Sequence, residues 1–161
     1  MPVFDHSFVV DGPLEAVRAF HGDTSALSVL SPPGTFVRLH AIEPLAEGSV
    51  SRFTLWLGPL PVRWTAVHRG VSERGFTDVQ QSGPAASWEH THTFVPLDDG
   101  RTRVDDHIEF AHHPGLGGAL TRVLFSRPNL HFLFAWRAFA TRRAVRALSR
   151  RDAGGPGRSR G

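Results

Sequence analysis

The side chains best suited to chemistry in this sequence lie in one run of seven residues, Trp88–Phe94. Trp88, His90, His92 and Phe94 alternate there with a glutamate and two threonines. Such alternation predicts a half-buried strand, because successive side chains of a strand point to opposite faces of the sheet. Two titratable imidazoles in a row are unusual on an inner face. They indicate a strand that lines a cavity and does not pack into a solid core.

The next strand brings a carboxylate within reach of these histidines. Residues 98–100, Asp-Asp-Gly, predict a three-residue hairpin loop with glycine in the left-handed conformation, which pairs Leu97 with Arg101. The same register then places His92 opposite Asp106. We therefore expect His92 and Asp106 to be cross-strand neighbours, close enough to form a hydrogen bond.

Composition excludes several classes of protein. The 161 residues suit one globular domain, and the absence of cysteine excludes disulfides and cysteine-bound zinc. We find no P-loop, no Gly-x-Gly-x-x-Gly after a strand and no Gly-x-Ser-x-Gly nucleophile motif. The first residues do not resemble a secretory signal, and no apolar run reaches membrane-spanning length. We expect a soluble, cytoplasmic protein.

Turn signals divide the chain into strands and helices. We expect a first strand over residues 2–10, a helix that starts near Pro13 and a short helix over 23–30. Regular turn signals then predict a meander of six strands, at 35–43, 49–57, 62–71, 75–81, 87–96 and 101–112. The last third is helical. Proline interrupts helices, so Arg127-Pro128 predicts a short helix to Ser126 and a long one from residue 128 to about 149.

This order of elements predicts an α+β fold in which a seven-stranded antiparallel sheet buries its apolar face against the long helix. The two short helices would hold the edge of the sheet away from that helix and leave space between them. We assign residues 1–151 to this single domain and residues 152–161 to a disordered tail rich in glycine and arginine.

Residues 12–17, 30–33, 76–80, 88–94 and 100–106 carry a family likeness. With the order of elements, they resemble the START-like superfamily, also called SRPBCC or helix-grip, over about residues 3–148. Within it, the chain is similar to the bacterial polyketide cyclase/dehydrase-like or coenzyme Q-binding-like group. The resemblance implies a curved sheet wrapped around the C-terminal helix. It also implies a bound lipid, sterol, polyketide, quinone or hormone between them, and enzymatic activity in a minority of members.

The histidines and Asp106 admit three interpretations. Two histidines and one carboxylate suit iron or zinc, but the resemblance offers no metal precedent, so we expect no metal and no cofactor. A His92–Asp106 pair could instead act as a general acid and base, as a cyclase or dehydratase requires, because the carboxylate raises the pKa of the imidazole. We favour the third interpretation, a buried pair that satisfies itself and polarises the cavity wall.

The favoured function is binding of a small hydrophobic molecule, such as a lipid, polyketide or quinone, between the sheet and the C-terminal helix. We expect the polar end of this ligand to be oriented by His6, His68, Gln80, His90, His92 and Asp106. Apolar side chains then form the cavity wall or the core, and the candidates are Phe53, Leu55, Trp64, Trp88, Phe94, Phe110 and Phe134.

Charge is distributed unevenly along the chain and leaves a further alternative open. Residues 1–121 hold 8 arginines against 14 acidic residues, whereas residues 122–161 hold 10 arginines against one. An arginine-rich C-terminal helix could dock on an anionic partner, although basic runs are usually just solvated. The sequence gives no clear indication of a nucleic-acid partner. The sequence does not determine whether the chain forms a homodimer, which ligand it binds or whether it catalyses a reaction.

Overall fold

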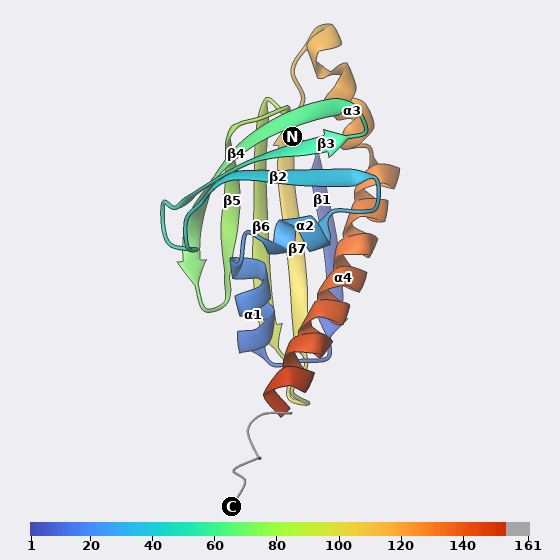
Figure 1. Ribbon diagram of the computed structural model, residues 1–161. Helices are drawn as coiled ribbons and strands as arrows, with labels where there is room; N and C mark the ends of the chain where they lie inside the picture. Colours follow the sequence, from blue (N-terminus) through green and yellow to red (C-terminus); the bar gives the residue numbers. More distant parts are fainter. Residues whose placement is uncertain (154–161) are drawn as a thin grey trace, which may run out of the picture.

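The strands form one antiparallel sheet in the spatial order β1-β7-β6-β5-β4-β3-β2 (Figure 1). The computed structural model describes residues 1–153, with side chains as far as Arg150. The strands are β1 (Val3–Val10), β2 (Thr35–Ile42), β3 (Val50–Leu57), β4 (Leu60–Ser72), β5 (Gly75–Ser82), β6 (Ser87–Pro96) and β7 (Thr102–Ala111). The edges of the sheet are therefore β1, from the start of the chain, and β2.

Helices cover the inner face of this sheet, and α4 runs along it from one end to the other (Figure 1). The helices are α1 (Leu14–Gly22), α2 (Ala26–Leu30), α3 (Ala119–Leu124) and α4 (Arg127–Ala153), with a 3-10 turn at Gly115–Gly118. The predicted α+β helix-grip architecture is thus confirmed. Helix α4 extends two residues into the tail predicted for 152–161, and the rest of that tail lies outside the described residues.

The predicted β6–β7 hairpin is confirmed residue by residue. The amide of Leu97 donates to the carbonyl of Arg101 at 2.8 Å, and Gly100 has a φ of 77°. His92 lies opposite Asp106 in the resulting register. A short loop with glycine at its left-handed position is therefore enough to fix which face of β7 carries the aspartate.

Helix α4 begins where the sequence predicted an interruption. Pro128 occupies its first turn, where a missing amide donor removes no helical hydrogen bond, so the break falls between α3 and α4. Further along α4, Arg142 Nε donates to the carbonyl of Val9 on β1 at 2.9 Å, and Arg146 pairs with Asp11 at 2.7 Å. These two arginines of the predicted basic arm are thus bound to the chain's own body.

Two apolar clusters pack between the sheet and α4. One lies towards the C-terminal half of α4 and includes Phe8, Val10, Val17, Phe76, Phe94, Val104, Ala138 and Val145. The other lies towards its N-terminal half and includes Phe4, Ala85, Trp88, Ile108, Phe110, Leu130 and Phe134. Both clusters contain phenylalanines that are fully buried, Phe94 and Phe134. They hold α4 against the sheet on either side of the polar residues described next.

Candidate functional site

A cavity of about 170 Å³ opens between the sheet and the helices. Its apolar wall comes from β3, β4, β6, α4 and the link between α3 and α4, through Phe53, Leu55, Trp64, Ala66, Trp88, Phe125 and Leu133. Its polar wall comes from α1, β4, β5, β6 and α4, through His21, His68, Asp78, His90, His92 and Arg137. The cavity therefore has one apolar and one polar side, as a site for an amphipathic molecule requires.

Asp106 binds both histidines of the run Trp88–Phe94, His90 and His92. Its Oδ1 atom accepts hydrogen bonds from His90 Nε2 at 3.0 Å and from His92 Nδ1 at 2.8 Å. All three side chains are buried, with exposed fractions of 3% for His90, 7% for His92 and 5% for Asp106. Asp106 lies behind the imidazoles and does not itself line the cavity. The predicted contact between His92 and Asp106 is thus present, and His90 shares it.

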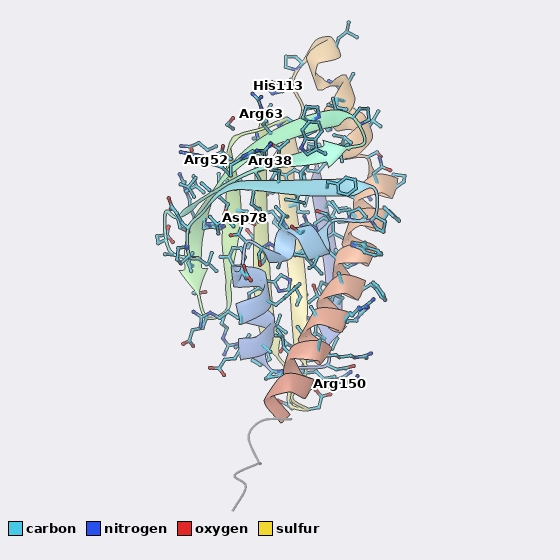
Figure 2. The ribbon with its side chains drawn as sticks, viewed as in Figure 1. Arg38, Arg52, Arg63, Asp78, His113 and Arg150 are labelled. Carbon is cyan, nitrogen blue, oxygen red and sulfur yellow. The ribbon has the colours of Figure 1, made fainter. Side chains whose placement is uncertain are left out.

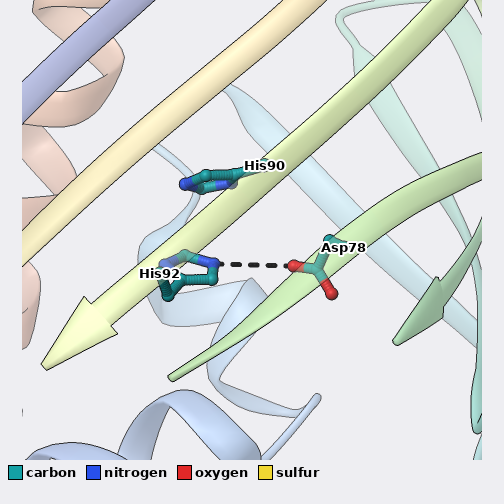
Figure 3. Close-up of side chains that lie close together, drawn as sticks. All are labelled: Asp78, His90 and His92. Carbon is teal, nitrogen blue, oxygen red and sulfur yellow. Dashed lines mark ion pairs between the residues drawn. The ribbon is translucent and has the colours of Figure 1, made fainter. Parts of the chain in front are cut away.

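A second carboxylate faces His92 from β5. Asp78 Oδ2 lies 3.5 Å from His92 Nε2, and this ion pair is the dashed line in Figure 3. Asp78 Oδ1 lies 3.2 Å from His68 Nε2 but makes no hydrogen bond with any described residue. His68 is held from behind, since its Nδ1 atom lies 2.9 Å from the hydroxyl of Ser49. The imidazole of His92 is therefore placed between two carboxylates.

At neutral pH these contacts keep the imidazole of His92 protonated and that of His90 neutral. Burial disfavours the charged form of His92, but its hydrogen bonds to Asp106 and Asp78 outweigh burial and raise its pKa to about 9. Burial and the neighbouring charge of His92 lower the pKa of His90 to about 4. Burial also opposes ionisation of Asp106, yet hydrogen bonds from both histidines hold its pKa below the usual range.

Helices α1 and α4 each add one nitrogen-bearing side chain to the cavity wall, His21 and Arg137. His21 on α1 is held through Nδ1 by the carbonyl of Val17 at 2.9 Å. Burial, followed by the charge of His92, lowers the pKa of His21 to about 4. Arg137 on α4 lies over the ring of Phe134 at 5.1 Å, and its Nε atom is buried with no hydrogen-bond partner among the described residues. Arg137 is thus available to a polar group inside the cavity.

The predicted site residues separate into those at the cavity and those elsewhere. Phe53, Leu55, Trp64, His68, Trp88, His90 and His92 line the cavity. The remaining aromatic candidates, Phe94, Phe110 and Phe134, pack into the core clusters. Gln80 donates to the carbonyl of Ala85 at 2.9 Å, and His6 lies 4.0 Å from Asp106 Oδ2, without lining the cavity.

Sequence reasoning did not assign a role to three polar residues of the cavity wall. Asp78 is two residues from Gln80 on the same strand, so the inward parity assigned to Gln80 applies equally to Asp78. His21 reaches the cavity from α1, and Arg137 reaches it from α4 through its long side chain. Neither residue lies in a strand whose alternation could indicate a cavity wall. Figure 2 labels Asp78, which lines the cavity. It also labels three arginines that are exposed and do not line the cavity, Arg38 on β2, Arg52 on β3 and Arg63 on β4.

Comparison with known proteins gives matches at the level of structure. No family model matches the sequence, and no curated protein matches it. A protein from Thermus thermophilus has a TM-score of 0.72 at 19% identity, over 92% of this chain and 99% of that chain. The Zhui aromatase/cyclase from Streptomyces sp. R1128 has a TM-score of 0.67 at 20% identity, over 96% and 99%. A START superfamily protein from Mycobacterium smegmatis has a TM-score of 0.66 at 15% identity, over 91% and 98%.

The chain has the START-like, or SRPBCC, helix-grip fold. TM-scores of 0.66 to 0.72 establish this fold, whereas identities of 20% or less leave the function to be argued from the cavity. None of the described helices is long and apolar enough to cross a membrane.

Proposed function

We propose that this START-like domain binds a small, mostly apolar molecule that carries one polar group. The observation that supports this function most directly is the two-sided cavity. Aromatic side chains such as Trp64 and Phe53 offer a flat apolar surface on one side, while His92, Asp78 and Arg137 face them with charge and hydrogen-bonding capacity. Apolar walls provide affinity, and a few polar groups fix the orientation of the ligand.

The size of the cavity limits the ligand class. A cavity of about 170 Å³ is slightly larger than a buried cavity of roughly 150 Å³ that admits benzene. It is smaller than the roughly 300 to 1,000 Å³ of typical drug-sized sites. The ligand that fits without movement of the chain is therefore a molecule of one or two rings. Longer lipids or polyketides would require α1, α2 or α4 to move.

Filling the cavity tests this proposal. Ala66 lines the cavity from β4, whereas the neighbouring Thr65 lies on the opposite face of the same strand. We expect 2-naphthol to bind the wild-type protein in isothermal titration calorimetry and to quench tryptophan fluorescence, because Trp64 and Trp88 line the cavity. Ala66→Phe should abolish both signals, and Thr65→Phe should retain them.

Equal binding by Ala66→Phe and Thr65→Phe would contradict the proposal. Native mass spectrometry of freshly purified protein provides an independent test. We expect an additional mass of a few hundred daltons or less, lost on denaturation, when a ligand is retained from the cell.

The contact between His92 and Asp106 favours a second candidate function, a dehydratase or cyclase. His92 lies at the cavity wall and Asp106 holds its Nδ1 atom at 2.8 Å, which is an arrangement used for general acid and base catalysis. In such a reaction the neutral imidazole of His21 would take the α-proton of a β-hydroxyketone, and His92 would donate a proton to the hydroxyl that leaves as water. Dehydration of 4-hydroxy-4-phenylbutan-2-one to the enone, followed by absorbance, tests this candidate. His92→Ala should abolish turnover and leave affinity for the ketone within about tenfold, or roughly 1.4 kcal/mol.

A further inference from the structure

Side chains of types that can bind metal ions meet at the polar end of the cavity, from strands β5 and β6. Asp78, His90 and His92 each offer one ligand atom, and these three atoms lie within 4.8 Å of one another (Figure 3). Two imidazoles and one carboxylate are a donor set typical of zinc and non-haem iron(II). All three side chains line the cavity, so a metal ion bound to them would keep a coordination position open towards it.

The hydrogen bonds behind the two histidines leave one nitrogen of each free for coordination. His90 uses Nε2 and His92 uses Nδ1 to bind the same oxygen of Asp106. His90 Nδ1 and His92 Nε2 are therefore the nitrogens that a metal would take. Histidine ligands of metals usually donate their other N–H to a carboxylate, which fixes the tautomer and orients the ring. Asp106 holds this supporting position for both histidines.

The carboxylate of Asp78 fits the third ligand position. Its Oδ2 atom lies 3.5 Å from His92 Nε2. Two ligands at ordinary zinc–ligand distances in a tetrahedral site are separated by about 3.4 Å. The other oxygen of Asp78 is buried, faces His68 at 3.2 Å and has no hydrogen-bond partner among the described residues. A buried carboxylate oxygen without a hydrogen bond is unusual, and a cation bound to the Asp78 carboxylate would compensate its charge.

We propose that Asp78, His90 and His92 bind one divalent first-row transition-metal ion, with Asp106 and His68 as supporting residues. This inference goes beyond the proposed ligand-binding function and does not depend on it. The ion takes the place of the proton between His92 Nε2 and Asp78, and Asp106 remains hydrogen-bonded to both imidazoles. Its open coordination position then faces the apolar wall formed by residues such as Trp64.

Titration with cobalt(II) tests the site, because Co²⁺ takes zinc-like geometries and absorbs visible light. Tag-free protein treated with a chelator should bind one Co²⁺ per chain with the visible bands of a four- or five-coordinate ion, and Zn²⁺ should displace it. Asp78→Asn and His90→Gln should each weaken binding about 100-fold or more. Asp106→Asn should weaken it by about 10- to 100-fold, as expected for a supporting residue.

His107→Gln is the matched control, since His107 is an exposed histidine on the outer face of β7, away from the cavity. It should bind Co²⁺ like the wild type. Binding of less than one equivalent by the wild type, or equal affinity in His107→Gln and His90→Gln, would overturn the proposal. Circular dichroism verifies that each variant is folded.

Nuclear magnetic resonance of the wild type keeps the proposal testable if the variants do not fold. One equivalent of Zn²⁺ should shift the imidazole signals of His90 and His92 and leave those of exposed histidines in place. Shifts confined to His107 or His113 would refute the site. Binding of 2-naphthol is measured separately, so failure of the ligand-binding function and failure of the metal site give different results.

Discussion

Asp106 is shared by two neighbouring imidazoles that differ in protonation state. Its Oδ1 atom accepts from both His90 and His92, yet only His92 has a second carboxylate, Asp78, on its other side. The pKa of His92 accordingly rises to about 9, whereas burial and the charge of His92 lower the pKa of His90 to about 4. Environments that separate the pKa values of adjacent groups are typical of functional sites.

At the residue scale, we expect Asp106→Asn to be strongly destabilising. Removal of one partner leaves the charge of His92 less compensated in a buried site, and such losses cost about 3–5 kcal/mol of unfolding free energy. Urea unfolding followed by circular dichroism measures the change.

Asp105→Asn is the matched control for this prediction. Asp105 neighbours Asp106 on β7 but lies on the outer face, where it pairs with Arg103 at 3.0 Å. Exposed pairs of this kind contribute about 1 kcal/mol or less. Similar losses of unfolding free energy in the two variants would show that the buried hydrogen bonds of Asp106 contribute no more to stability than an exposed ion pair does.

At the element scale, a local turn signal predicted the β6–β7 hairpin, and no comparable turn signal predicted the pairing of Asp78 with His90. The glycine loop at Gly100 fixes the register of β6 and β7, so His92 and Asp106 could be paired from sequence. Strands β5 and β6 are joined by residues 83–86, but the pair nearest this connection is Val79 with Glu89. No tight hairpin turn therefore fixes the register that pairs Asp78 with His90. Turn residues determine the register of β6 and β7, whereas the register of β5 and β6 depends on tertiary contacts.

A pH-dependent contact joins β1 to β7 on the outer face of the sheet. Asp5 and His107 are cross-strand partners 2.6 Å apart, and the hydrogen bond to Asp5 raises the pKa of His107. A raised pKa means that the contact stabilises the folded state fully below the unfolded pKa of about 6.5 and loses this effect as the pH rises through the folded value. Asp5→Asn should lower the pKa of His107 in an NMR titration. An unchanged titration curve would show that Asp5 does not act on His107.

Close packing between α4 and the start of α1 gives a second prediction at this scale. A Cβ atom at Gly12 would lie 2.5 Å from Val145 Cγ1, in a fully buried part of α4. Gly12→Ala should therefore displace α4 and cost about 1–3 kcal/mol, measured by thermal or urea unfolding. Gly117→Ala is the control, because its Cβ would meet its nearest neighbour, His113 Cβ, at 3.9 Å. A loss in Gly12→Ala no greater than in Gly117→Ala would contradict this account of the packing.

At the scale of the whole molecule, stability and cavity depend on different aromatic residues. Phe134 is fully buried in a core cluster, whereas Phe53 is half-buried at the cavity wall. Phe134→Ala should cost about 3–5 kcal/mol of unfolding free energy, as large core truncations do. Phe53→Ala should cost less than half as much and change the affinity for 2-naphthol. Equal destabilisation would show that the cavity wall is part of the core.

The sequence predicted the architecture of the molecule better than the composition of its cavity. Alternation and turn residues are local patterns, and they located all seven strands and the long helix. The cavity wall combines side chains from α1, α4 and four strands, and no local pattern records that Arg137 and His21 come together with Asp78. For the same reason the sequence pattern could not distinguish Phe94 and Phe134, which lie in the core, from residues of the cavity wall.

The two edge strands of the sheet, β1 and β2, differ in the contacts that they make with the rest of the chain. At the β1 edge, Arg142 of α4 takes the carbonyl of Val9, while the β2 edge carries Phe36 with an exposed fraction of 72%. A free strand edge is a template for pairing with another chain. Helix α4 thus occupies one carbonyl of the β1 edge, which makes β2 the more open of the two edges. Two copies that paired antiparallel through β2 would be related by a two-fold axis, and this contact would close on itself.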